Sequence, residues 1–197
     1  MKIFTGDWKT DNKIMYSYLD EVDFYKHGRK GDIMEGIPRS GRSMCWGSSW
    51  RYPCRKNTKI EGIELYYTKC REANKHLKDV YKEFINLYWK DFDFNDNTQV
   101  QMNKNFPCPP HKDSLNVGLS ILVGFGDYLG GEINIVNEDE ETIKLDIRKK
   151  NGVVFNGANL LHFVSPFTLE NTNRYSLVFF NTIQLKNNDE FKSYEII

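Results

Sequence analysis

The chain of 197 residues carries 27 Lys and Arg against 27 Asp and Glu, so its formal net charge is zero and only local charge could attract nucleic acid. Its length fits a single domain with its own hydrophobic core. The four cysteines show neither CxxC pairs nor zinc-finger spacing, and no segment resembles a signal peptide or a membrane span. We therefore expect an intracellular protein of the cytoplasm or nucleus, not secreted, with reduced thiols.

The first stretch, up to about Thr58, is rich in Gly, Ser, Arg and aromatic residues and keeps no helical period for long. Between Phe24 and Lys59 it carries nine basic residues against two acidic ones, a local charge of +7. Aromatic residues are interleaved with these charges: Phe24, Tyr25, Trp46, Trp50 and Tyr52. Such a segment suits phosphate neutralisation and base stacking. The alternative is a solvated flank whose aromatic residues pack beneath the core.

The second stretch, from about Ile60 to Trp89, has the period of a helix with one buried face. Its apolar positions recur three or four residues apart: Ile63, Tyr67, Cys70, Ala73, Leu77, Val80, Phe84 and Leu87. Asn and Asp residues cluster between Phe92 and Asn97 and end the pattern. The sequence therefore predicts one long helix here.

The third stretch, from about Thr98 to Gln184, is a succession of short segments rich in Val, Ile, Leu and Phe. They are VGLSILVGF, GEINIVN, ETIKLDI, GVVFNG, LLHFVSPF and RYSLVFFNTI, separated by Gly, Asn or Asp. Short strands without intervening helices favour an antiparallel sandwich or barrel. We expect one domain of 197 residues, with loops and a helix over residues 1–97 and a strand core over residues 98–184.

A possible metal-binding pattern lies in this strand-rich region. His111 and Asp113 are two residues apart, so on a strand both would project from the same face. A later strand that carries His162 could bring a third ligand to the same point. Two imidazoles and one carboxylate on one side of a metal form the facial triad typical of non-haem Fe(II). Taken singly, each of these residues could equally be a hydrogen-bonded pair or a satisfied core histidine.

Arg174 lies 12 residues after His162, in the apolar segment RYSLVFF. A guanidinium buried among apolar side chains needs an anionic partner, and its planar fork matches a carboxylate. Ser176, two residues on, would add a hydroxyl on the same face. A small dicarboxylate near the metal would satisfy this arrangement, and so would a buried ion pair with a protein carboxylate.

The ordered set HxD, GDYLGGEI, LLHFVSP and RYS resembles the Fe(II)/2-oxoglutarate-dependent dioxygenases. The resemblance covers about Gln101 to Phe180 and implies a mainly β protein with α (α+β), with a double-stranded β-helix (jelly-roll, cupin-like) core and the long helix packed on it. It implies that His111, Asp113 and His162 hold Fe(II) and serve catalysis. It further implies that Arg174, Ser176 and Asn103 bind the cosubstrate 2-oxoglutarate. Oxidative decarboxylation to succinate and CO2 with O2 would then drive oxidation of a C–H bond.

Within this family, HKDSLNVGLSILVGFGDYLGGEI resembles the branch of the TET and J-binding proteins, which oxidise the methyl group of 5-methylcytosine or thymine in nucleic acid. Asn116, three residues after Asp113, matches an Asn that helps to hold the target base in that branch, or it completes the turn into the next strand. The resemblance implies a DNA substrate with a flipped base. Arg39 and Arg42, in PRSGR, are further candidates for substrate contacts.

The chain departs from that branch in two respects: RYSLVFFNTIQ lacks the second base-contacting His, and cysteine-rich zinc-binding extensions are absent. A hydroxylase of a small molecule or a protein side chain therefore remains an alternative. A non-catalytic cupin-like module that binds a ligand is the alternative of another class. We expect a monomer without an obligate protein partner or a membrane association.

Overall fold

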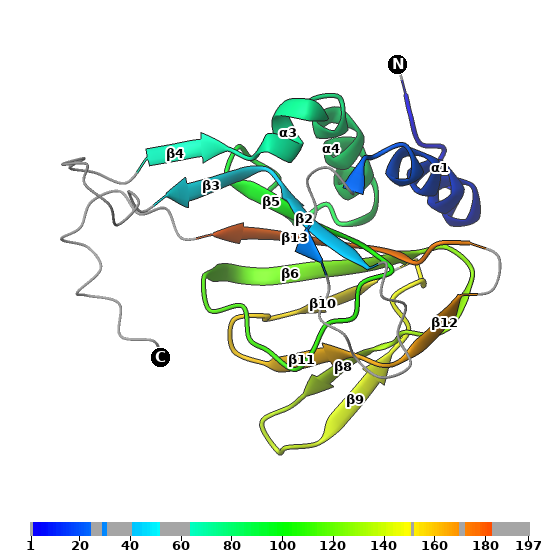
Figure 1. Cartoon of the computed structure of the whole chain (residues 1–197), viewed down its shortest axis with the longest axis vertical. Helices are drawn as coiled ribbons and strands as arrows, with labels where there is room; N and C mark the ends of the chain where they lie inside the picture. Colours follow the sequence, from blue (N-terminus) through cyan, green and yellow to red (C-terminus); the bar gives the residue numbers. More distant parts are fainter. Residues whose placement is uncertain are drawn as a thin grey trace.

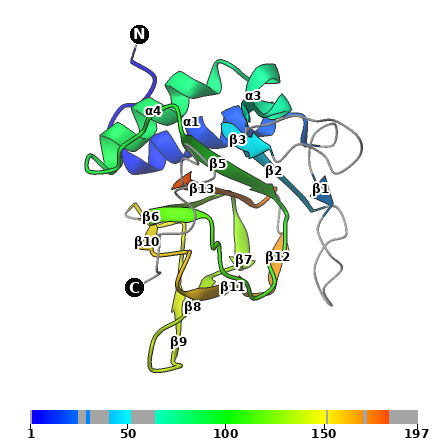
Figure 2. The same cartoon turned by 90° about the vertical axis from the view of Figure 1, so that its left-hand side faces the viewer.

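The computed structural model describes residues 2–24, 29–30, 41–51, 64–150, 152–169 and 172–182. In Figures 1 and 2 this part of the chain forms three layers. Helices cover one face of a large antiparallel sheet, and smaller sheets lie beneath its other face. The predicted fold class, mainly β with α (α+β) and a double-stranded β-helix core, is confirmed, but the single long helix predicted to pack on it is not present in the described residues.

The large sheet has six strands in the order β1-β2-β5-β13-β6-β10. They are β1 (Arg29–Lys30), β2 (Arg42–Trp46), β5 (Thr98–Lys104), β13 (Tyr175–Thr182), β6 (Asn116–Phe125) and β10 (Val153–Phe155). All neighbouring pairs are antiparallel, and β13 lies in the middle, where it pairs β5 on one side and β6 on the other. The last described strand of the chain is thus central to the sheet.

The opposing layer is built from shorter strands. A three-stranded sheet has the order β11-β8-β9, from β11 (Leu161–Val164), β8 (Ile133–Val136) and β9 (Thr142–Leu145). β7 (Tyr128–Gly130) pairs with β12 (Phe167–Leu169), and β3 (Ser48–Arg51) pairs with β4 (Glu64–Tyr67) on the helical side.

Within the described residues, three helices flank the large sheet: α1 (Trp8–Asp20), α3 (Lys69–Ala73) and α4 (Leu77–Tyr88). Asp7 caps α1 by accepting the Thr10 N–H at 2.9 Å, and Thr68 caps α3 in the same way through Arg71. The apolar face of α4 buries Leu77, Val80, Tyr81, Phe84 and Ile85 against the sheet. None of the helices in the described residues is long and apolar enough to cross a membrane.

Strand alternation divides the large sheet into a helix-facing core and a cavity-facing wall. On β13, Tyr175, Leu177 and Phe179 belong to the core under the helices, whereas the intervening residues face the small sheets. A second apolar cluster between the two layers contains Leu122, Tyr128, Ile133, Ile135, Ile147, Val153, Phe155, Val164 and Phe167. The candidate site lies beside this second apolar cluster, between the two layers.

Two expectations about the elements are wrong. The long helix expected from about Ile60 is β4 followed by α3 and α4, with a turn at residues 74–76 between the helices. In addition, the first stretch is not devoid of helix, because α1 spans 13 of its residues. That stretch also supplies β2, which pairs with β5 and so extends the sheet that carries the site.

Candidate metal centre

His111 and Asp113 lie in the loop between β5 and β6, so the expectation that a strand carries them is wrong. His111 forms an isolated antiparallel bridge with His162, in which each N–H donates to the other's carbonyl oxygen at 3.1 and 3.0 Å. The Asp113 N–H donates to Gly157 O at 2.8 Å. These backbone bonds hold the loop against β11 and the turn before it. Pairing with β11, rather than strand alternation, brings the two residues together.

The three predicted ligands converge. Their ligand atoms all lie within 4.8 Å of one another. His111 Nε2 is 3.5 Å from Asp113 Oδ1, and His162 Nε2 is 3.6 Å from Asp113 Oδ2. His162 is buried and the other two are half-buried, so the cluster is reached from one side. This donor set of two nitrogens and one carboxylate fits a facial Fe(II) site.

Both imidazoles are oriented through their second nitrogen. His111 Nδ1 lies 2.8 Å from Pro109 O, and His162 Nδ1 lies 2.9 Å from Leu160 O. A carbonyl oxygen only accepts, so Nδ1 carries the proton and the Nε2 lone pair is directed at the cluster. The Phe155 ring contacts the His162 ring edge-on at 4.9 Å between centroids and restricts its rotation.

A cavity of about 320 Å³ connects this cluster to the large sheet. Its lining includes the three candidate ligands and, on the sheet, every predicted cosubstrate residue. The full lining is Ser43, Gln101, Asn103, Phe106, Cys108, His111, Asp113, Leu122, Ile133, Phe155, His162, Val164, Arg174, Ser176, Val178 and Phe180. The structure therefore places Arg174, Ser176 and Asn103 in one cavity with the metal-ligand candidates.

Arg174, which immediately precedes β13, is 1% exposed. Its Nη2 donates to Gly131 O at 3.0 Å, but its Nε and Nη1 have no hydrogen-bond partner among the described residues. The guanidinium packs between Tyr128 and Phe167, 5.3 and 5.0 Å from the ring centroids. Burial lowers the pKa of this guanidinium, yet an arginine stays charged at neutral pH. A buried cation with two unused donors has the chemistry to bind an anion.

Tyr128, which stacks on Arg174 but does not itself line the cavity, is a neighbour of the site that sequence reasoning missed. Its hydroxyl is buried, has no hydrogen-bond partner among the described residues, and belongs to the ring that stacks on Arg174. Burial raises the pKa of Tyr128, so the hydroxyl keeps its proton and can donate. Its place in GDYLGG gave only a turn signal, because nothing in the sequence indicates that β7 crosses beneath Arg174.

A line of hydrogen bonds runs across β2, β5 and β13 along the cavity wall. Gln101 Nε2 donates to Ser43 Oγ, which donates to Asn103 Oδ1 at 2.7 Å. Asn103 Nδ2 in turn donates to Ser176 Oγ at 3.2 Å. Ser43, Asn103 and Ser176 are direct cross-strand neighbours. This direction leaves the Ser176 hydroxyl hydrogen available for an acceptor in the cavity.

Of the predicted substrate-binding residues that the structure describes, only Asn116 lies beside the ligand cluster. Asn116, at the start of β6, points its side-chain nitrogen at Asp113 Oδ2 at 3.4 Å. Arg42 lies at the start of β2, where its Nη1 donates to Gly41 O at 3.0 Å, and it is not part of the cavity lining. Arg39 and most of the basic, aromatic segment from Phe24 to Lys59 lie outside the described residues.

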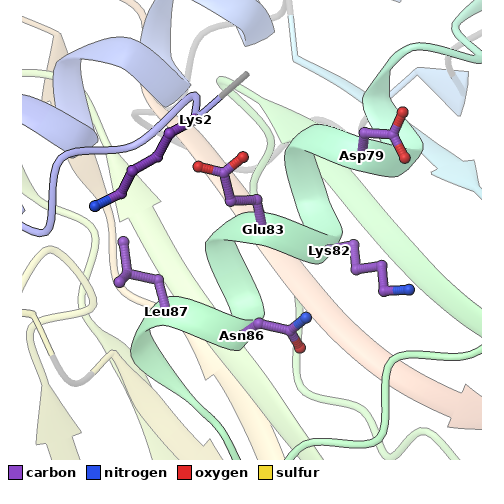
Figure 3. A pocket seen from close by; sticks show the side chains of 6 residues that line it. All are labelled: Lys2, Asp79, Lys82, Glu83, Asn86 and Leu87. Atoms are coloured by element: carbon purple, nitrogen blue, oxygen red, sulfur yellow. The ribbon is translucent and has the colours of Figure 1, made fainter.

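A second, more open hollow lies on the outer face of α4, far from the ligand cluster in sequence (Figure 3). One of its two acidic residues, Glu83, already accepts the backbone N–H groups of Ile3 and Phe4 at 2.7 and 2.9 Å. Those bonds fix the N-terminal segment to α4. The hollow is therefore a junction between the N-terminal segment and α4, at which Glu83 has a structural role.

No protein-family model and no curated protein sequence matches the chain. Among solved structures, a prolyl-4-hydroxylase from Pseudomonas putida is similar at a TM-score of 0.47 and 13% identity, over 92% of this chain and 90% of that one. A dioxygenase for auxin oxidation from Arabidopsis thaliana, in complex with 2-oxoglutarate, gives 0.45 and 16%, over 95% and 84%. A 2OG-Fe(II) oxygenase family oxidoreductase from Burkholderia pseudomallei gives 0.43 and 15%, over 74% and 72%. Likeness at this level decides nothing about activity, which must be argued from the residues of the cavity.

Proposed function

We propose that the chain is an Fe(II)- and 2-oxoglutarate-dependent dioxygenase. One observation carries the proposal: a His-Asp-His cluster and a buried arginine with two unused donors line the same cavity. Either feature alone has an ordinary structural explanation. Together they provide a metal site with open positions on one side and a site for a carboxylate in the same cavity.

The residues fit Fe(II). His111 and His162 present their Nε2 atoms, Asp113 presents both oxygens, and the two Nδ1 hydrogens are fixed on backbone carbonyls. When bound, the iron would supply activation of O2 coupled to decarboxylation of 2-oxoglutarate to succinate. The protein's own part is to hold the three ligands on one side and to leave the cavity side open for the reactants.

The residues also fit a dicarboxylate. Arg174 would bind the distal carboxylate through Nε and Nη1, with a hydrogen bond from Ser176 Oγ. The apolar residues Leu122, Ile133 and Val164 line the same cavity and would exclude water around the carbon chain. Asn103 would act by fixing the orientation of Ser176.

For the substrate, we propose the methyl group of a pyrimidine base, 5-methylcytosine or thymine, in DNA. The support is the basic and aromatic segment that precedes the core, and the resemblance at HKDSLNVG. Arg39 and Arg42 would contact phosphates. Asn116 keeps a free side-chain carbonyl for a base N–H donor, because its nitrogen is used within the protein. A small molecule or a protein side chain is the alternative substrate of the same chemistry.

The test is anaerobic loading with Fe(II) and 2-oxoglutarate, followed by exposure to O2 with oligonucleotides that contain 5-methylcytosine or thymine. Succinate and digested nucleosides are quantified by mass spectrometry. We expect succinate and a gain of one oxygen on the base, both lost in Asp113→Ala and retained in Asn86→Ala, whose exposed amide on α4 points away from the core (Figure 3).

Each remaining outcome has a definite meaning. Succinate without base oxidation would keep the dioxygenase and reject the DNA substrate in favour of a small molecule or peptide. Absence of succinate with every substrate would contradict the enzyme and favour the cupin-like binding module. Full activity in Asp113→Ala would contradict the ligand assignment itself.

A further inference from the structure

The side-chain amide of Asn116 occupies a defined place behind the carboxylate of Asp113. Asn116 Nδ2 lies 3.4 Å from Asp113 Oδ2 and 3.2 Å from Ser120 Oγ. The backbone of the same residue closes a turn, with its N–H donating to Asp113 O at 2.9 Å. Both amide hydrogens of Asn116 therefore have acceptors within the protein.

The two oxygens of Asp113 face different partners. Oδ1 faces His111 Nε2 at 3.5 Å, whereas Oδ2 faces His162 Nε2 at 3.6 Å and receives the amide of Asn116. A hydrogen bond on one oxygen of a ligating carboxylate fixes the rotation of the whole group about its terminal bond. The choice of which oxygen meets a metal is thereby restricted.

The surroundings make such a restraint necessary. Asp113 stands in a loop, and its side chain keeps 34% of its exposure, so packing covers only part of it. From the opposite side the backbone of Gly157 approaches closely: a Cβ there would lie 3.3 Å from both Asp113 Oδ2 and Ser120 Oγ. Ser120 itself is completely buried on β6, which gives the amide a rigid anchor.

We propose that Asn116 is a positioning residue that holds the Asp113 carboxylate in its metal-binding orientation, anchored by Ser120. The inference rests on the metal site of the proposed function and adds to it. It assigns the amide nitrogen to the metal site, whatever its carbonyl contacts. The spacing of three residues between Asp113 and Asn116 follows from this geometry, since one turn returns the side chain to the carboxylate.

The experiment measures metal affinity without turnover. Mn(II) binding to the full chain is titrated by calorimetry and electron paramagnetic resonance for wild type, Asn116→Ala, Asn116→Asp and the control Asn86→Ala. We expect the dissociation constant to rise about tenfold in Asn116→Ala. It should rise at least as much in Asn116→Asp, which keeps the shape but replaces the donor by a second carboxylate. Asn86→Ala should match wild type.

A second readout separates positioning from folding. The Co(II) absorption spectrum reports ligand geometry, so it should change in both Asn116 variants while the circular dichroism and thermal midpoint stay near those of Asn86→Ala. Unchanged Mn(II) affinity and Co(II) spectrum in Asn116→Ala would overturn the proposal, including the case in which only the KM for an oligonucleotide rises. Failure of wild type to bind Mn(II) would instead reject the metal site of the proposed function.

Discussion

At the scale of single residues, Arg174 has the most unusual environment in the described part of the molecule. The free energy of burying a charge is recovered only when its donors are satisfied, and one guanidinium bond to Gly131 O does not satisfy five donors. Stability alone gives no reason for a cation at this position. A site kept ready for an anion does, and it implies that function and stability oppose each other here.

Replacement of Arg174 by Met tests that opposition. We expect Arg174→Met to unfold with a free energy equal to that of wild type or up to about 3 kcal/mol higher, because an apolar side chain of similar length removes an unsatisfied charge. Binding of 2-oxoglutarate to the Mn(II)-loaded protein should be lost in calorimetry. The control Arg71→Met, which breaks the ion pair with Asp96, should be less stable and should bind 2-oxoglutarate normally. A destabilised Arg174→Met would show that the guanidinium is satisfied in the free protein.

Tyr128 allows an equally selective change. Tyr128→Phe removes a hydroxyl without a partner in the described residues, so unfolding should need no less free energy than in wild type. The affinity for 2-oxoglutarate should stay near that of wild type, because a Phe ring keeps the stack on Arg174 and Tyr128 does not line the cavity. Tyr81→Phe is the matched control, because its buried hydroxyl also lacks a partner there but lies in the helix-facing core. A loss of 2-oxoglutarate affinity in Tyr128→Phe but not in Tyr81→Phe would show that the Tyr128 hydroxyl reaches the bound carboxylate.

At the scale of elements, the sequence predicted the parts whose signals are local. The strands β6, β8, β9, β10, β11 and β13 follow from apolar runs and turn residues, and the ligand set followed from its order in the chain. The short strands β7 and β12 were missed, because GDYLGG gives only a turn signal and β12 has only three residues. The turn at residues 74–76 was not predictable, because Cys70, Ala73 and Leu77 continue the helical period across it. There Asn74 Nδ2 donates to Cys70 O at 3.0 Å and ends α3.

Two further elements were missed for other reasons. α1 carries buried Asp11, Met15 and Leu19 but is polar overall, so its period was weak. β2 gives no sign in the sequence that it pairs with β5, some 58 residues later, because strand neighbours depend on tertiary contacts. For the same reason Ser43 could not be assigned to the cavity wall from sequence.

The contribution of β2 to the site can be measured through Ser43. In Ser43→Ala the amide of Asn103 loses the donor that fixes its orientation, and Ser176 then becomes free to turn. We expect the dissociation constant of 2-oxoglutarate to rise about three- to tenfold, the effect of one indirect hydrogen bond, with the Mn(II) affinity unchanged. Ser17→Ala on the exposed face of α1 should have no effect. An unchanged affinity for 2-oxoglutarate in Ser43→Ala would show that β2 does not contribute to the cosubstrate site.

The N-terminal segment and α1 are joined through Asp11, which accepts hydrogen bonds from Thr5 N, Thr5 Oγ, Gly6 N and Tyr88 Oη at 2.6 to 2.8 Å. Burial acts to raise the pKa of Asp11, but these bonds outweigh it and hold the pKa below its ordinary value of 3.8. The ionised carboxylate therefore stabilises the fold above that value, and this contribution is lost as the pH falls through the lower folded pKa.

Asp11→Asn should accordingly lower the free energy of unfolding by about 2 kcal/mol at pH 7, because amide hydrogens would then face N–H and O–H donors. In denaturant titrations at several pH values, the difference from wild type should stay constant down to about pH 4 and shrink below it. A difference that persists undiminished below pH 2 would show that the charge of Asp11 is not what stabilises the fold.

At the scale of the whole molecule, ligands that bind only the folded cavity must raise its stability by mass action. With Mn(II) present under anaerobic conditions, 2-oxoglutarate at 100 times its dissociation constant should add about 2.7 kcal/mol. For a chain of this length, that corresponds to about 5–10 °C in Tm by calorimetry. Asp113→Ala should lose the part of this increase that depends on Mn(II). An increase of equal size in that variant would place the ligand elsewhere.

The central position of β13 also has a consequence for synthesis of the protein. β5 and β6 both pair with β13, which is the last of the described elements to leave the ribosome. Until then, apolar edges of both strands have no native partner, and such edges favour aggregation and slow, non-local folding. Translation of the first 174 residues therefore yields a nascent chain in need of chaperone protection, and the arrival of residues 175–182 completes the sheet and the cavity wall together.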